Sequence, residues 1–253
     1  MINPVHRVPA AIVVASFLIA GCGGGTAETL GGQGAGGSSA RQGVAAPAPA
    51  PTASPEAAPR RLPGLGPRTW AAVPSRTRQA VVVTGRGKNS PLSTVVLYER
   101  TEAGWEAGPS RPARNALKGW TDHHLAGDLR SPIGVFGLTD AGGLRPDPGT
   151  RLPYDRSGAF TSPGTGFDGE SLAGAFDYVV AVNYNRRPGT TPLDWTRPLG
   201  SARGGGIWLH VDHGGPTHGC VGLREGDLKE LMRDLDPDRH PVVVMGDAAS
   251  LAR

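Results

Sequence analysis

Five short apolar runs, each ended by glycine, proline or other turn residues, most constrain what this chain can fold into. They are rich in β-branched residues and lie at 80–83, 94–98, 178–182, 207–211 and 242–245. Such runs between turn residues are typical of strands. A helix is predicted for residues 225–235, whose leucines fall on one face before Pro237. The sequence therefore predicts a mainly β domain with one or two helices.

Residues 1–22 have the three parts of an export signal. A short basic start contains His6 and Arg7, and the apolar run at 10–20 is too short to span a bilayer as a lone helix. Small residues then precede Cys22, which resembles the bacterial lipoprotein box, in which this thiol carries a diacylglycerol. The resemblance implies an exported protein, lipid-anchored on the outer face of the cytoplasmic membrane and facing the cell wall. An ordinary secretory signal with a chance cysteine is the alternative.

Residues 23–68 are low in complexity and rich in glycine, alanine and proline. They have too little apolar surface to offset the entropy lost on ordering, so we expect a disordered tether. The folded domain is predicted to occupy residues 69–253.

The formal net charge of the 253-residue chain is +4, but its distribution argues against a nucleic-acid partner. The excess lies before residue 69, in Arg7, Arg41, Arg60, Arg61 and Arg68 against Glu28 and Glu56. The predicted domain is nearly neutral and shows no basic stripe.

The two cysteines lie in separate motifs, so we interpret Cys22 as a lipid attachment site and Cys220 as a free reactive thiol. The second motif runs from Thr217 through His218 and Gly219 to Cys220 (THGC). It matches the [Ser/Thr]-His-Gly-Cys signature and resembles the L,D-transpeptidases. The similarity extends over most of residues 78–247. It includes GDLRSPIGVF at 127–136, NYN at 183–185 and a strand that ends in His210.

The chemistry of this motif can be argued from its residues. Acyl transfer from an amide needs a nucleophile, a base and donors for the oxyanion, and a thiol becomes a good nucleophile as thiolate. A histidine within reach can take the proton of Cys220, and the resulting imidazolium stabilises the thiolate. Gly219 leaves the preceding backbone bare, so the amides of His218, Gly219 and Cys220 can converge on the oxyanion. A buried structural cysteine is the alternative.

We predict that His210 is the base, because it stands where the family has its catalytic histidine. Relatives carry alanine in place of His218, so that side chain is not essential to the chemistry. The sequence departs from the family after the cysteine, where Gly222 replaces an arginine or asparagine that helps to hold substrate or loop. Arg224 is a candidate substitute, and Tyr184 and Asn185 are weaker candidates for substrate binding.

Zinc binding by His210, His213, His218 and Cys220 is a competing interpretation of the same segment. Glycines and a proline break any helix that could present two of these histidines on one face. His123 and His124 are adjacent and are expected to form a solvated turn. We therefore expect neither a metal nor a cofactor.

The resemblance implies a β-sandwich or barrel-like domain that acts on stem peptides of the cell wall. Cys220 would attack the carbonyl of the third residue of a tetrapeptide stem and form a thioester. The side-chain amine of another stem would resolve it, giving a 3→3 cross-link. Alternatives are an L,D-carboxypeptidase on the same scaffold and a non-catalytic peptidoglycan-binding lipoprotein. A monomer is expected.

Overall fold

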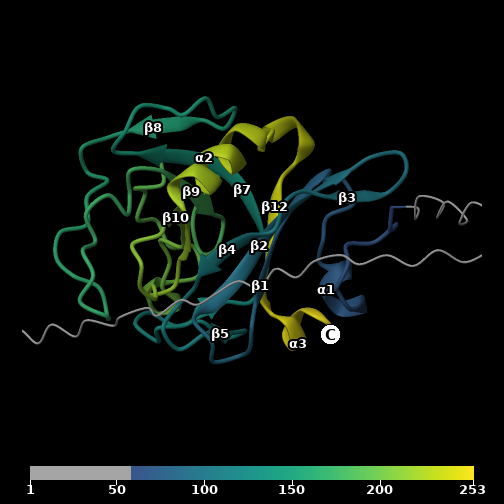
Figure 1. The fold of residues 1–253 in the computed structure, drawn as a ribbon, viewed down its shortest axis with the longest axis horizontal. Coiled ribbons are helices and arrows are strands. Elements are labelled where there is room, and N and C mark those ends of the chain that lie inside the picture. Colours follow the sequence, from purple (N-terminus) through teal and green to yellow (C-terminus); the bar gives the residue numbers. More distant parts are fainter. Residues whose placement is uncertain (1–57) are drawn as a thin grey trace, which may run out of the picture. The chain divides into compact units, whose positions relative to one another are not determined.

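The computed structural model describes residues 58–253, which form a mainly β domain (Figure 1). The strands are β1 (Gln79–Gly85), β2 (Leu92–Arg100), β3 (Trp105–Ala107), β4 (Arg111–Arg114), β5 (Trp120–Thr121), β6 (Ser131–Pro132), β7 (Gly134–Gly143), β8 (Tyr154–Arg156), β9 (Val179–Val182), β10 (Trp208–Val211), β11 (Val221–Leu223) and β12 (Val242–Asp247). The helices are α1 (Pro67–Ala71), α2 (Glu225–Asp234) and α3 (Ala248–Leu251), with 3-10 turns at Ser201–Arg203 and Pro237–Arg239.

Eight strands close on themselves, in the order β1-β12-β7-β9-β10-β11-β4-β2. Closure comes from β1, which pairs in parallel with β12 on one side and antiparallel with β2 on the other. The short strands β3 and β8 extend the sheet at β2 and β7. An eight-stranded barrel has an interior about wide enough to be filled by side chains. The predicted barrel-like, mainly β fold is confirmed.

The main core fills this interior and draws side chains from all eight strands of the barrel. Side chains alternate between the two faces of a strand, so Val81 and Val83 of β1 point inward while Ala80 and Val82 point outward. The apolar face of α2 joins the core through Leu228, Leu231 and Met232. The predicted helix and the five predicted strands are all present.

The outer face of β1 and β12 is covered by chain from both ends of the domain. Leu62 is 1% exposed and packs there with Trp105 and Leu251. The carbonyl of Pro59 accepts a hydrogen bond from the Trp105 amide at 2.8 Å. Residues 58–68 therefore belong to the folded unit, and the predicted boundary at residue 69 is placed too late. Apolar residues in this stretch are few, which is why composition alone assigned it to the tether.

The outer face of β9 and β10 carries a third cluster, which includes Phe160 and Trp208 and against which Cys220 packs. The barrel thus places the cysteine on its outside, apart from the main core. The predicted signal, Cys22 and the tether up to residue 57 lie outside the described residues. Within residues 58–253, no helix is long and apolar enough to cross a membrane.

Replacing Leu62 by alanine tests whether residues 58–68 are part of the fold. Leu62→Ala should lower the free energy of unfolding by about 2–5 kcal/mol, because it leaves a cavity between residues 58–68 and the barrel. Urea denaturation of the purified protein measures this, with Leu199→Ala as the control, since Leu199 is 61% exposed. An unchanged midpoint in Leu62→Ala would contradict the packing described above.

Candidate active site

The pairing of β10 with β11 sets the positions of the predicted nucleophile and base. The two strands run parallel, with Leu209 beside Val221 and His210 beside Gly222. Leu209 and Val221 point into the main core. By alternation, His210 and Cys220 share the outer face and are diagonal neighbours on it. The structure thus brings the two predicted catalytic residues together.

The thiol of Cys220 lies at a cleft and is held by backbone groups. Its Sγ is 3.5 Å from the Gly206 carbonyl oxygen, to which it donates, and 3.4 Å from the Trp208 amide nitrogen, from which it accepts. Burial raises the pKa of the Cys220 thiol to about 11, and the Trp208 hydrogen bond offsets this only in part. The resting cysteine is therefore a neutral thiol at pH 7.

His210 is only 2% exposed and lies behind the cysteine, outside the cleft lining. Its Nδ1 is 2.8 Å from the Val211 carbonyl oxygen. A carbonyl can only accept, so Nδ1 carries the proton and Nε2 is left as the acceptor. Burial lowers the pKa of His210 to about 4, so the ring is neutral at pH 7. The expected imidazolium–thiolate pair is therefore not the resting state.

Two aromatic rings fix the plane of the His210 imidazole. The His213 ring lies parallel to it at 5.7 Å between centroids, and Phe176 meets it edge-on at 5.6 Å. His213 is itself held by Glu170, whose Oε1 is 2.9 Å from His213 Nδ1. The sequence offered His213 only as a candidate zinc ligand and gave Glu170 no role, because 43 residues separate the two and no motif links them.

The turn that precedes the cysteine is shaped by Thr217 and Gly219. The Thr217 hydroxyl donates to the Cys220 carbonyl at 2.7 Å. A Cβ added at Gly219 would lie 2.9 Å from Ile207 Cδ1, so a side chain there would collide with the cleft wall. The amides of Gly219 and Cys220 have no acceptor among residues 58–253, as expected of oxyanion donors.

The His218 side chain is exposed and lines the same cleft as Cys220. Its ring lies 4.6 Å from that of Phe167, between centroids. His218 thus lies on the rim of the cleft, and the choice of His210 over His218 as the base stays a prediction.

The cleft has a volume of about 430 Å³. It is lined by His124, Ala126, Gly127, Trp195, Arg197, Ser201, Gly204, Gly205, Gly206, Ile207, His218, Gly219 and Cys220. His124 corrects an expectation, since it is 5% exposed and not part of a solvated turn. Its Nδ1 is 3.0 Å from Asp128 Oδ1, though poorly aligned for a hydrogen bond. Desolvation lowers the pKa of His124, so this ring is also neutral at pH 7.

Tyr184 and Asn185 support the cleft wall and do not line it. The Tyr184 hydroxyl donates to the Arg203 carbonyl at 2.9 Å, and Asn185 Nδ2 donates to the Gly204 carbonyl at 2.6 Å. Both residues are about 95% buried. Both residues hold the loop that ends at Gly206, and their predicted contact with substrate stays a prediction.

Arg224 also lies outside the cleft lining, as the exposed residue before α2. It does not fill the place left by Gly222. Across the sheet from Gly222 lies Arg114 of β4, whose Nε is 3.5 Å from Asp212 Oδ2. A Cβ at Gly222 would lie 3.2 Å from the Asp212 Cα. Glycine therefore makes room for the turn that carries Asp212.

The histidines that the zinc interpretation grouped together have separate partners. His210 donates to a carbonyl, His213 contacts Glu170, and His218 packs on Phe167. Within the part of the chain that the structure describes, no group of three or more histidine, cysteine or acidic residues is arranged to hold a metal ion.

Comparison with known proteins gives a family-model match over more than half of the chain. The family model of YkuD, described as the L,D-transpeptidase catalytic domain, matches residues 75–244. No curated protein matches. The solved structure of Bd1075 from Bdellovibrio bacteriovorus is similar at 16% sequence identity and a TM-score of 0.38. That match covers 68% of this chain and 48% of Bd1075, so the chain spans about half of that protein's length. On the family match, the chain belongs to the YkuD family of L,D-transpeptidase catalytic domains.

Proposed function

We propose that this protein is a peptidoglycan L,D-transpeptidase in which Cys220 is the nucleophile and His210 the base. The observation that carries the proposal is the shared outer face of β10 and β11, with the thiol at the cleft and His210 behind it. The His210 tautomer supports it, because the hydrogen bond to the Val211 carbonyl leaves Nε2 free to accept a proton.

The proposed reaction has two steps. Cys220 passes its proton to His210 Nε2, and Sγ attacks the carbonyl of the third stem residue. The amides of Gly219 and Cys220 stabilise the oxyanion. The C–N bond then breaks, the terminal residue leaves as an amine with the proton from His210, and a thioester remains. The side-chain amine of a second stem attacks the thioester, loses a proton to His210, and forms the cross-link as the thiol is regenerated. With water as acceptor the product would be a shortened stem.

The neutral resting pair has a consequence for when the thiolate forms. Burial disfavours the charged forms of both Cys220 and His210. Proton transfer is therefore expected to accompany attack on bound substrate and not to precede it. Apo sites commonly show loose catalytic hydrogen bonds that tighten on binding, and here the thiol proton is directed to Gly206.

Cys220→Ala should abolish both covalent acylation and cross-linking, because the thioester needs sulfur. Mass spectrometry of the protein after incubation with a carbapenem checks this, with His218→Ala as a control that should still form the adduct. An adduct retained in Cys220→Ala would refute the cysteine mechanism. A wild-type protein that no acylating agent modifies would favour the non-catalytic binder.

His210→Ala should slow turnover of a stem peptide by at least ~10²-fold, with a smaller loss for His218→Ala. The pH profile of thiol alkylation gives a second readout. With the pKa of Cys220 raised to about 11, the alkylation rate should climb through the alkaline range. It should show no plateau below pH 7 in either wild type or His210→Ala. A larger loss in His218→Ala would contradict the assignment of His210 as the base, and a plateau at acidic pH would contradict the neutral resting pair.

We also propose that the mature protein begins at a lipidated Cys22 and faces the cell wall from the outer face of the cytoplasmic membrane. Its support is the sequence before Cys22, Ile19 to Gly21, with the short apolar run ahead of it. Two or more acyl chains would hold the protein stably, where a single chain would not. In this proposal the residues that follow carry the domain to stem peptides in the wall.

Metabolic labelling with a fatty acid should mark the wild-type protein and leave Cys22→Ala unlabelled. Cys220→Ala is the matched control, because it removes the other cysteine and should keep the label. Unlabelled wild-type protein released into the medium would show that residues 1–22 are an ordinary secretory signal.

A further inference from the structure

Three consecutive glycines form one wall of the cysteine cleft, and the absence of side chains there leaves room for neighbouring residues. Gly204, Gly205 and Gly206 have φ of +63°, +142° and +68°, where side chains are strained. A Cβ at Gly204 would lie 2.9 Å from His124 Nε2. A Cβ at Gly205 would lie 2.3 Å from Arg197 Nε, and one at Gly206 would lie 3.5 Å from Arg197 Nη2. The glycine run thus provides the surface on which the Arg197 guanidinium lies.

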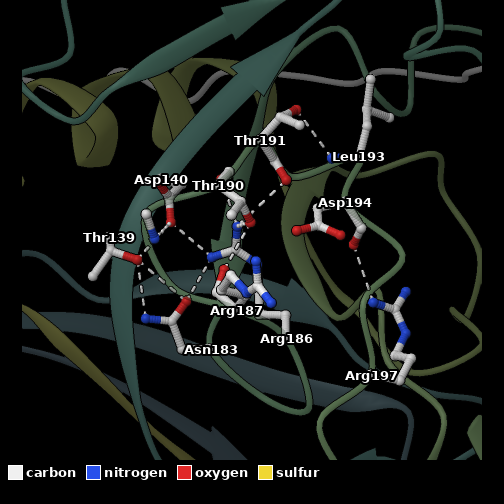
Figure 2. Close-up of polar contacts among 11 residues, drawn as sticks. Thr139, Asp140, Asn183, Arg186, Arg187, Thr190, Thr191, Leu193, Asp194 and Arg197 are labelled. Atoms are coloured by element: carbon white, nitrogen blue, oxygen red, sulfur yellow. Dashed lines mark hydrogen bonds and ion pairs between the residues drawn. The ribbon is translucent and has the colours of Figure 1, made fainter.

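Arg197 is the one residue of the cleft lining with a permanent positive charge. Its Nη1 donates to the Asp194 carbonyl at 3.1 Å (Figure 2) and to the Thr196 carbonyl at 3.1 Å. Its Nε and Nη2 have no acceptor among residues 58–253, and no carboxylate there forms an ion pair with it. Desolvation lowers the pKa of Arg197. The guanidinium is thus partly stripped of water, and the Asp194 carboxylate, which raises its pKa, forms no ion pair with it.

The loop that carries Arg197 is fixed from within the domain. At its base Arg186 forms a buried ion pair with Asp140 of β7, with 2.7 Å between Nη1 and Oδ2 (Figure 2). At its other end, Asn185 holds the carbonyls of Gly200 and Gly204. The Trp195 ring, 76% exposed, lies over the guanidinium with its centroid 4.8 Å from Arg197 Cζ. Arg197 is therefore held in place before any ligand arrives.

The guanidinium and the thiol lie against the same residue. The Cys220 thiol donates to the Gly206 carbonyl, and Arg197 Nη2 lies over the bare Cα of Gly206. In a peptide attacked at one carbonyl, the next residue follows at about 3.8 Å between Cα atoms. If the leaving side of a bound peptide lies toward Gly206, the free carboxylate of a residue that ends the peptide at that point comes next to the Arg197 guanidinium. Arginine binds carboxylates through paired, charge-assisted hydrogen bonds.

We propose that Arg197 binds the α-carboxylate of the residue released when Cys220 is acylated, and so selects donors that end one residue after the attacked carbonyl. The inference rests on the proposed function and adds a specificity-determining residue to it. A donor that is amidated at this carboxylate, or extended past it, would leave the guanidinium desolvated and without a partner.

The test uses two synthetic stem tetrapeptides that differ only in a C-terminal acid or a C-terminal amide. Release of the terminal residue is measured for the wild type, Arg197→Gln and Arg187→Gln. Arg187 is the matched control, because it is an exposed arginine on the same loop and outside the cleft lining (Figure 2). Binding of both peptides to Cys220→Ala, with and without Arg197→Gln, gives a readout that does not depend on turnover.

The wild type should favour the acid over the amide by about 10- to 100-fold in kcat/KM. Arg197→Gln should lose that preference through slower use of the acid alone, and Arg187→Gln should keep it. Binding to Cys220→Ala should show the same pattern. Equal use of both donors by the wild type, or a preference that survives Arg197→Gln, would overturn the inference and leave the proposed function standing. If neither donor acylates Cys220 in the wild type, the proposed function fails and the inference fails with it.

Discussion

The register between β10 and β11 is the constraint on which the site depends. These strands are three and four residues long, yet their parallel pairing decides which side chains share a face. A slip of one residue would turn Cys220 into the main core and Val221 toward the cleft. The register is held on both sides, since Leu209, Val221 and Leu223 are fully buried inside the barrel. Core packing thus fixes the position of Cys220 relative to His210, the proposed nucleophile and base.

The walls of the cleft are built differently from its floor. The walls consist of loops, and buried polar contacts hold these loops in place where there is little hydrophobic packing. The Arg186–Asp140 pair, with side chains 3% and 5% exposed, anchors one wall to β7. Removing either partner would leave an uncompensated buried charge, which is strongly destabilising. The loop can therefore carry an exposed Trp195 and a cationic Arg197 without being free to fold over the thiol.

The sequence predicted the elements that have a local sequence pattern. It did not predict features that depend on contacts between distant parts of the chain. The strands at 80–83 and 242–245 followed from β-branched runs, and the THGC motif led to the cysteine and, by its family, to His210. Strand β7 was not predicted, because its glycines are not typical of strands. They are needed for close approach, since a Cβ at Gly143 would lie 2.2 Å from the Asp177 carbonyl oxygen. The sequence could not predict the cleft positions of Arg197 and His124 or the contact of Glu170 with His213. Each depends on residues that only the folded barrel places next to one another. Residues 58–68 have the composition of a linker, and only the packing of Leu62 with Trp105 shows that they belong to the fold.

The raised pKa of Cys220 bears on the durability of the protein as well as on its chemistry. Oxidation of cysteine to sulfenic acid and beyond proceeds through the thiolate and follows solvent access. A thiol with a pKa of about 11, partly buried and hydrogen-bonded to backbone, exposes almost no thiolate at neutral pH. Peroxide and disulfides should therefore react slowly with the resting thiol, whereas the proposed mechanism forms the thiolate only when substrate is bound. A nucleophile arranged in this way can persist in an oxidising environment without a reducing system to restore it.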